Sequence, residues 1–210
     1  MQWIRIILYK FQVAWTVLLH ISFPTLSVIV VYNSIPTAAA QNDNANVLTY
    51  TNIQLGFTIN YPSNWTLNDR DIVNDHKVVS FTSPDRVGVV FVQIQNATQY
   101  EIAVYNMDDT AKTNTIMTHL TPGESLVELD VTHYLLSGHP AIRIIETQSF
   151  GGSEEPISYK PYDAKGMIYS VIIGGKLYKV AYMVTPPERF PIYLQTAQSM
   201  IDSFKIMNRQ

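Results

Sequence analysis

The sequence contains residue types used in metal and acid–base chemistry, but their spacing matches no catalytic or metal-binding motif. Four histidines follow the first forty residues, namely His76, His119, His133 and His139. None forms a His-x-x-x-His pair, and the His-Glu-x-x-His signature of zinc proteases is absent from the sequence. His139 lies in a Gly-His-Pro turn, where we expect a hydrogen bond with the backbone rather than general base catalysis.

A surface cation site is one hypothesis that the acidic residues allow. Glu128 and Asp130 fall on one face of an expected strand, and His133 follows just past its end. Carboxylates with an imidazole suit a divalent metal ion. A solvated strand edge explains the same pattern and is the interpretation that we favour, so we expect neither a metal nor another cofactor.

A second acidic group, Asp69, Asp71 and Asp75, lies in an expected polar loop. A calcium-binding EF-hand loop needs Gly at its sixth position and Glu at its twelfth. Counted from Asp69, these positions hold Asn74 and Ser80. The segment therefore does not have the calcium-binding pattern.

The sequence also lacks the motifs of nucleophilic catalysis. It has no Gly-x-Ser-x-Gly elbow, and Gly174-Gly175-Lys176 lacks the upstream glycine of a phosphate-binding loop. The chain has no cysteine, which excludes disulfides, thiolate catalysis and cysteine-ligated metals. We therefore expect a non-catalytic protein. The alternative from a different class is a small exported hydrolase whose triad is assembled from dispersed residues.

Asn64 and Asn96 are candidate glycosylation sites, because each begins an Asn-x-Thr sequon. Packing of Trp65 in the core would weaken the first sequon, and use of Thr98 as a helix cap would weaken the second. Thirteen tyrosines also leave open a cell-surface carbohydrate-binding or adhesive module with an exposed row of aromatic rings. Tyrosines at expected strand positions favour sheet packing instead.

Charge separates a basic N-terminal segment from an acidic remainder. Arg5 and Lys10 precede Asp43, and all seventeen acidic residues lie at or after Asp43. The remainder carries the other twelve Lys and Arg residues, which gives it a formal charge of about −5. Such a domain has no electrostatic basis for holding a phosphate backbone, so nucleic acid is disfavoured as a partner.

The first forty residues predict export across a membrane. The range 11–32 has no charged side chain, and Ala38 and Ala40 supply the small residues of a signal-peptidase site before Gln41. The apolar stretch exceeds the usual ~7–15 residues of a signal core and is long enough to span a bilayer, so an uncleaved anchor is the alternative. In either form the domain lies outside, and we expect membrane contact only through this segment, if it is retained.

One domain, 47–208, is expected after a short polar tether at 41–46. Apolar patterning predicts strands in chain order at 57–61, 78–82, 88–94, 125–132, 140–147, 167–173 and 177–184. Gly174 and Gly175 supply the positive φ angles of a tight hairpin turn between the last two strands. Because short turns link most strand pairs, the sheet is expected to be mostly antiparallel in an α+β domain.

Two helical segments are expected. Thr98-x-x-Glu101 has the form of a capping box at the start of a helix that extends to about Leu120. Apolar residues from Phe190 to Phe204 recur at spacings of three and four, which predicts an amphipathic helix that buries one face. We expect Leu194, Ile201 and Phe204 among the most buried side chains.

Four short segments carry a family pattern through their order and spacing. They are Gly56–Trp65 (Gly-Phe-Thr-Ile-Asn-Tyr-Pro-Ser-Asn-Trp), Phe81–Pro84, Leu136–Ala141 and Met200–Phe204. In this order they resemble the PsbP-like family and its relatives, the Mog-like proteins, in which a strand ends in a Tyr-Pro turn before a Trp. The resemblance covers about residues 47–206.

This resemblance implies an α/β/α sandwich around a mostly antiparallel central sheet and a non-catalytic role. One branch of the family is an extrinsic lumenal subunit that assists calcium and chloride retention at the oxygen-evolving centre, and the Mog-like branch binds a nuclear GTPase. An exported chain departs from the nuclear setting, and the long N-terminal binding region of the photosynthetic branch has no match here. The implied function is an exported accessory domain that docks on a partner protein or membrane-associated complex.

The N-terminal segment generates the first prediction. We expect the protein isolated from its native host to begin at Gln41, because the small residues Ala38 and Ala40 fit a signal peptidase. Edman degradation or mass-spectrometric sequencing measures this directly. An intact Met1 would contradict cleavage and establish the anchored form.

Overall fold

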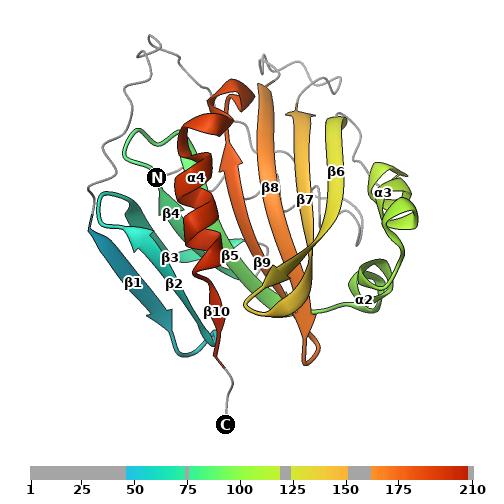
Figure 1. Ribbon diagram of the computed structural model, residues 1–210, viewed down its shortest axis with the longest axis horizontal. Coiled ribbons are helices and arrows are strands. Elements are labelled where there is room, and N and C mark those ends of the chain that lie inside the picture. The colour runs from blue at the N-terminus through green and yellow to red at the C-terminus, as the bar shows by residue number, and fades with distance from the viewer. Residues whose placement is uncertain (1–45, 74–75, 119–123, 151–161, 208–210) are drawn as a thin grey trace.

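The computed structural model describes residues 46–73, 76–118, 124–150 and 162–207 (Figure 1). The expected cleavage site between Ala40 and Gln41 lies outside these residues, as do Asp75 and His119. Within the described part of the chain, no helix has the length and apolar character needed to cross a membrane.

The described strands form a main sheet of seven strands and a small sheet of three. The main sheet has the order β3 (Thr66–Val73), β4 (His76–Thr82), β5 (Gly88–Asn96), β9 (Lys176–Val184), β8 (Tyr162–Ile173), β7 (His139–Phe150) and β6 (Glu124–Leu136). The small sheet has the order β1 (Val47–Asn52), β2 (Phe57–Pro62) and β10 (Lys205–Ile206). All pairings among the described strands are antiparallel, as the α+β prediction requires.

β5 and β9 lie at the centre of the main sheet because both are apolar on both faces. Every residue from Gly88 to Ile94 is buried, and so is every residue from Leu177 to Val184. Their pairing joins two meanders, β3–β4–β5 and β6–β7–β8–β9. The expected hairpin turn before β9 is confirmed, with φ angles of 57° at Gly174 and 75° at Gly175.

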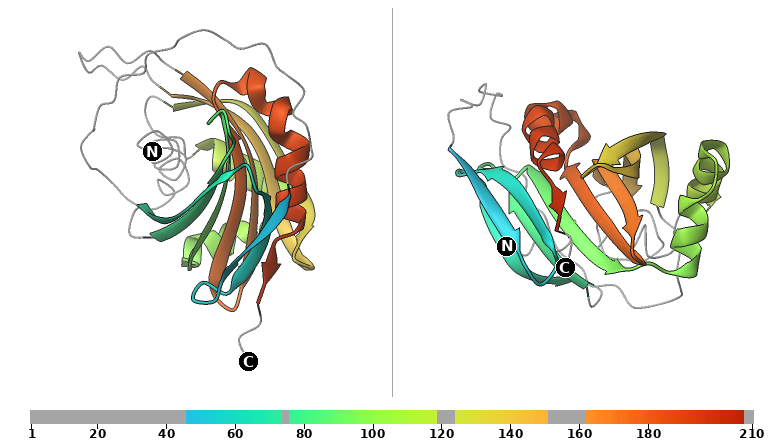
Figure 2. Two further views of the ribbon diagram at one scale, coloured as in Figure 1. Left: turned by 90° about the vertical axis from the view of Figure 1, so that its left-hand side faces the viewer. Right: turned by 60° about the horizontal axis from the view of Figure 1, so that its bottom comes forward.

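Helices lie on both sides of the main sheet, which confirms the sandwich that the resemblance implies (Figure 2). α4 (Phe190–Asp202) packs on β5 and β9 on one face and also contacts β2. It follows a short 3-10 turn, η1 (Pro187–Arg189). α2 (Gln99–Tyr105) and α3 (Asp109–Thr118) lie toward the other side near β6, and Tyr105 packs into the apolar cluster of that opposite face.

The single helix expected from the capping box to about Leu120 is wrong, because the structure has two helices there. α2 ends at Tyr105 with Asn106 as its C-cap. The carboxylate Oδ1 of Asp108 accepts the backbone N–H of Ala111 at 2.8 Å, as an N-cap does at a helix start. This local bond starts α3 as a new helix. The segment therefore forms two short helices, whereas the sequence predicted a single long helix.

The expected polar loop at 69–75 is also corrected, because Asp69 and Asp71 lie in β3. β3 is an edge strand with an irregular register between Asn68 and Asp71. Its sequence, TLNDRDIV, lacks regular apolar alternation. Pairing with β4, rather than periodicity, makes it a strand. β1, another edge strand of largely exposed residues, was not predicted for the same reason.

The apolar face of α4 is buried as expected, with one exception. Ile201 and Phe204 are almost completely buried, whereas Leu194 is only half-buried and was wrongly expected among the most buried side chains. Phe204 lies just past the end of α4, where its ring contacts Phe57 of β2 with centroids 5.5 Å apart. Trp65 packs edge-on against Tyr193, with ring centroids 5.6 Å apart. This contact confirms the expected burial of Trp65.

This packing predicts a large difference between two substitutions. Phe204→Ala removes a fully buried ring, which typically costs ~3–5 kcal/mol and should lower Tm by roughly 6–20 °C. Gln195→Ala, at an exposed position of α4, should leave Tm nearly unchanged. Thermal unfolding followed by circular dichroism measures both. Equal and small effects would mean that Phe204 does not contribute to the core.

Candidate functional site

Asp130 and His133 of the hypothetical cation site do not converge. Glu128, Asp130 and His133 all lie in β6, which continues to Leu136, so His133 is within the strand rather than beyond it. Asp130 and His133 are three residues apart and therefore point to opposite faces. Asp130 pairs with Arg143, and His133 Nε2 lies 3.3 Å from Asp109 Oδ2 of α3. Among the described residues, no group of three or more His, Asp or Glu side chains is arranged to hold a metal ion.

A dispersed hydrolase triad would need His133 or His139 in a deep pocket beside a carboxylate and a hydroxyl, and neither histidine lies in an enclosed site. The His133 side chain is 75% exposed, and His139 is exposed where β7 begins after the Ser137-Gly138 turn. Ser137 Oγ accepts the backbone N–H of Ile206 at 2.9 Å, a structural bond that ties the turn to β10. The arrangement gives no support for a dispersed triad.

In the second sequon, the threonine has a structural role at the start of a helix. Asn64 and Asn96 are both exposed, in the turn after β2 and at the end of β5. Thr98 serves as the N-cap of α2, because its Oγ1 accepts the Glu101 N–H at 3.1 Å and its own N–H donates to Glu101 Oε2 at 2.8 Å. The expected capping box is thereby confirmed. Glycosylation at either asparagine stays a prediction.

The aromatic side chains do not form a sugar-stacking platform in the described part of the chain. Every Tyr and Trp whose side chain is described there is buried or half-buried. Tyr169, Tyr178 and Tyr182 lie on strand positions inside the core, as expected from the sequence. This distribution counts against the carbohydrate-binding alternative.

The strongest candidate is a stretch of the main sheet that α4 leaves uncovered. α4 packs on β5 and β9, and Figure 1 shows β6, β7 and β8 beside it without a helix in front of them. Leu136 and Ala141 on this side are buried at the hairpin end, whereas five other side chains of β6 and β7 on this side are partly or fully exposed. We call them the open face, which consists of Asp130, Thr132, Tyr134, Arg143 and Ile145.

A hydrogen-bond network links the open face to α4. The Tyr134 hydroxyl donates to Asp202 Oδ1 at 2.6 Å, and Gln198 Nε2 donates to the same oxygen at 2.7 Å. The Tyr169 hydroxyl of β8 donates to Gln198 Oε1 at 2.8 Å. The rings of Tyr134 and Tyr169 meet nearly edge-on with centroids 4.7 Å apart. The network holds the Tyr134 ring in one orientation.

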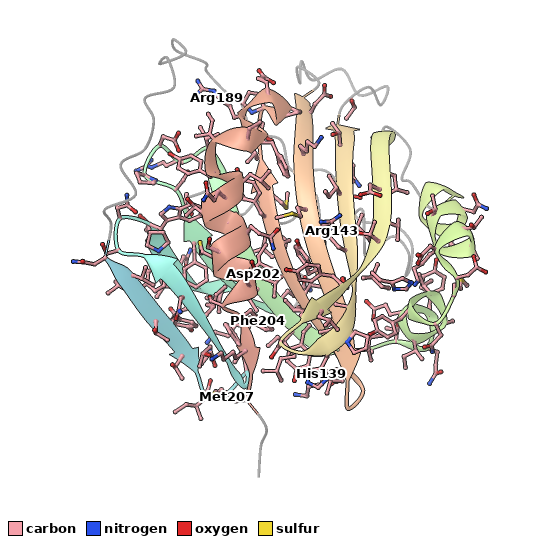
Figure 3. The ribbon with its side chains drawn as sticks, in the orientation of Figure 1. His139, Arg143, Arg189, Asp202, Phe204 and Met207 are labelled. Carbon is pink, nitrogen blue, oxygen red and sulfur yellow. The ribbon has the colours of Figure 1, made fainter. Side chains whose placement is uncertain are left out.

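Arg143 provides the positive charge of the open face. Its Nε donates to Thr132 Oγ1 at 3.0 Å, and a terminal guanidinium nitrogen lies 3.8 Å from Asp130 Oδ2. The Arg143 side chain is 31% exposed and that of Asp130 is 52% exposed, so solvent screens this ion pair and it adds little stability. Figure 3 shows Arg143 on β7 and Asp202 on α4. Arg143 is therefore oriented while part of its guanidinium remains available to another molecule.

The electrostatics of the network favour neutral, proton-donating tyrosines. The hydrogen bond to the Asp202 carboxylate, together with burial, raises the pKa of Tyr134 to about 12. Burial also raises the pKa of Tyr169, and the Gln198 hydrogen bond and Arg143 oppose this shift. Phenols with raised pKa values do not act as bases or nucleophiles at neutral pH. The open face can bind and orient another molecule, and neither tyrosine supplies a phenolate base or nucleophile at neutral pH.

A second charged group lies buried on the opposite face and connects α2 to the main sheet. Lys179 Nζ of β9 lies 3.8 Å from Glu101 Oε1, and both side chains are about 7% exposed. Gln95 Nε2 donates to the same glutamate oxygen at 2.8 Å. Burial lowers the pKa of Lys179 to about 8, and the Glu101 charge opposes that shift. Because Glu101 is also the capping-box residue of α2, we assign this pair a positioning role.

Sequence reasoning did not identify the open face. The open face and the network that holds it draw their polar residues from β6, β7, β8 and α4, and Tyr134 and Asp202 are 68 positions apart in the chain. The one local signal is that Arg143 interrupts the apolar residues of β7. A charged residue inside a strand of a packed sheet needs a partner or solvent, and here it has both.

Comparison with known families gives one match over most of the chain. The profile of the family described as PsbP-like protein matches residues 25–206. No curated protein matches the chain.

Comparison with solved structures gives distant likenesses. The chain is similar to a Bacteroides thetaiotaomicron protein (12% identity, TM-score 0.43), with 77% of this chain covered but only 48% of that protein. It is similar to the cyanobacterial PsbP (CyanoP) of Synechocystis sp. PCC 6803 (13%, TM-score 0.46), with coverage of 82% and 98%. It is also similar to the Saccharomyces cerevisiae Ran-binding protein Mog1p (9%, TM-score 0.48), with coverage of 79% and 97%.

The buried ion pair generates a prediction about pH. The unfolded chain keeps the Lys179 proton up to its ordinary pKa of 10.5, whereas the folded chain releases it near 8. Raising the pH between these values therefore favours the folded state, by on the order of 1 kcal/mol per pH unit. The variant Lys179→Met with Glu101→Gln removes both charges and keeps a residue that can form the capping box.

Urea unfolding at several pH values from 8 to 10 measures this effect. We expect the free energy of unfolding of the unmodified chain to rise with pH relative to that of the double variant. Tyrosines with raised pKa values act in the opposite direction but are common to both proteins. Parallel pH profiles would contradict a proton release from Lys179 in this range.

Proposed function

The chain belongs to the PsbP-like protein family, and on this premise we propose that it is an exported, non-catalytic accessory protein that docks on a partner protein through the open face. The observation that carries the proposal is the uncovered region of β6 and β7, where Tyr134 and Arg143 are oriented by a network anchored on α4. The partner is a protein of a membrane-associated complex on the outer side.

The side chains of the open face suit protein recognition. Tyrosine and arginine are enriched among the residues that dominate binding energy at protein interfaces. Tyr134 is held by the Asp202 hydrogen bond and by the Tyr169 ring, so little conformational freedom is lost when a partner binds. Ile145 adds a partly buried apolar surface next to these polar groups. The result is a mixed surface with oriented donors and a positive charge.

The chemistry of the partner follows from the charges on this surface. Among the residues that the structure describes, Arg143 pairs with one exposed carboxylate, that of Asp130 at 3.8 Å, and the planar guanidinium can pair with a second carboxylate. The neutral Tyr134 hydroxyl is already used as a donor to Asp202. A partner that places an acidic side chain over Arg143 and an apolar side chain over Ile145 is complementary to the open face. No cofactor is required for this role.

Site-specific crosslinking tests the proposal. The chain has no cysteine, so Thr147→Cys, on β7 beside Ile145, introduces a single thiol next to the open face for a photo-crosslinker, to be used in native membranes. We expect one major crosslinked protein, whose yield falls about tenfold or more when Arg143→Glu is added, because a buried charge contact is reversed. Tyr134→Ala should reduce the yield in the same direction.

Lys205→Glu is the matched control, because it reverses a charge at an exposed position of β10 on the small sheet. It should leave the crosslinking yield unchanged, and Tm should confirm that all variants fold. Unchanged crosslinking by Arg143→Glu would contradict the open face as the docking site. Labelling of the unmodified protein by a broad serine-hydrolase probe would contradict the non-catalytic role.

A further inference from the structure

The outer edge of β1 is an unpaired strand edge within the described residues. The sheet order is β1–β2–β10, so β1 has a neighbour on one side only. The Ser63 N–H bonds the Asn46 carbonyl at 2.7 Å, and residues 47–52 continue this antiparallel register. Hydrogen-bonded residues alternate along such a pair. Val47, Thr49 and Thr51 therefore direct their N–H and C=O groups away from β2.

Exposed apolar side chains gather along the same edge. Four large hydrophobic residues of the described chain are exposed, and three of them belong to β1 or the turn after it. Val47 is 68% exposed, Leu48 43% and Ile53 79%. Val47 lies at one end of β1, and Ile53 directly follows the other end. An apolar residue thus marks each end of the unpaired edge.

β1 has no charged residue, proline or bulge that would prevent edge-to-edge pairing. Natural edge strands are commonly protected by charged side chains, proline or a bulge. The sequence of β1 is VLTYTN, with no charge and no proline, and its register with β2 is regular. In a domain with a formal charge of about −5, a neutral strand can meet an identical strand without repulsion between like charges.

We propose that β1 pairs antiparallel with β1 of a second copy of this chain, about a two-fold axis that places Tyr50 opposite Tyr50. In this register Thr49 lies opposite Thr51 of the second copy, so the unpaired backbone groups of both strands bond each other. Val47 of one copy then lies beside Ile53 of the other, at both ends of the pair. The two small sheets become one continuous six-stranded sheet.

The two-fold arrangement explains the positions of the exposed residues. An antiparallel pair of identical strands is an isologous interface, in which each contact occurs twice. Apolar residues at the two ends of a strand meet each other only when the partner strand runs in the opposite direction. The pairing uses β1 and leaves the open face of β6 and β7 free. It is therefore independent of the proposed docking function.

Charge substitutions at the edge test the pairing. The full chain is prepared in detergent micelles as tagged and untagged copies, and retention of the untagged copy by the tagged one is measured. Thr49→Lys with Thr51→Lys places like charges directly opposite each other across the axis, and should retain its own copy about tenfold less than the unmodified chain does. When this lysine variant is mixed with the double variant Thr49→Glu, Thr51→Glu, retention should recover, because the lysines of one copy then face the glutamates of the other.

Thr58→Lys with Asn60→Lys is the matched control. These residues are the β2 partners of Thr51 and Thr49, so the same charges lie one strand in from the edge. This variant should retain its copy as the unmodified chain does. Equal retention by the Thr49 and Thr51 lysine variant would place the association elsewhere, in the apolar N-terminal segment or the shared micelle, and would overturn the proposal. So would a monomeric unmodified chain, or failure of the lysine and glutamate variants to retain each other.

Discussion

The burial of one face of α4 against β5 and β9 determines how the rest of that side of the sheet is covered. Seven strands spaced about 4.8 Å apart form a sheet about 29 Å wide, whereas one helix is about 10 Å across. α4 therefore covers the central strands only. The small sheet covers β3 and β4 beside it, where Tyr50 and Tyr61 pack against Phe81. β6 and β7 have neither cover.

The uncovered strands differ in composition from the covered ones for this reason. The α4 side of β5 carries Val90 and Val92, which are fully buried, whereas the same side of β7 carries Arg143. Tyr134 and Tyr169 mark the boundary, since their rings pack together while their hydroxyls reach α4. These hydrogen bonds between the tyrosines and α4 shield the edge of the apolar core from solvent, so no further helix is needed there. The surface beyond it remains available for recognition.

The sequence predicted those elements whose stability is encoded locally or by continuous apolar residues. β5 and β9 have apolar side chains on both faces, the capping box defines the start of α2, and Gly174-Gly175 defines the last hairpin turn. β1 and β3 were missed because neither edge strand has regular apolar alternation, and each forms only by pairing with its neighbour. The network of Tyr134 with Gln198 and Asp202 could not be predicted, because tertiary packing alone brings these residues together.

The pairing of β5 with β9 has a consequence for how the chain reaches its folded state. Gly88 pairs with Val184, and Asn96 with Lys176, so the two central strands come from distant parts of the sequence. Such non-local pairing raises the contact order and slows folding. Until β9 has emerged, β5 offers an apolar strand with an open edge, which is prone to aggregate. A copy truncated before β9 would therefore leave β5 without its partner and its apolar edge open.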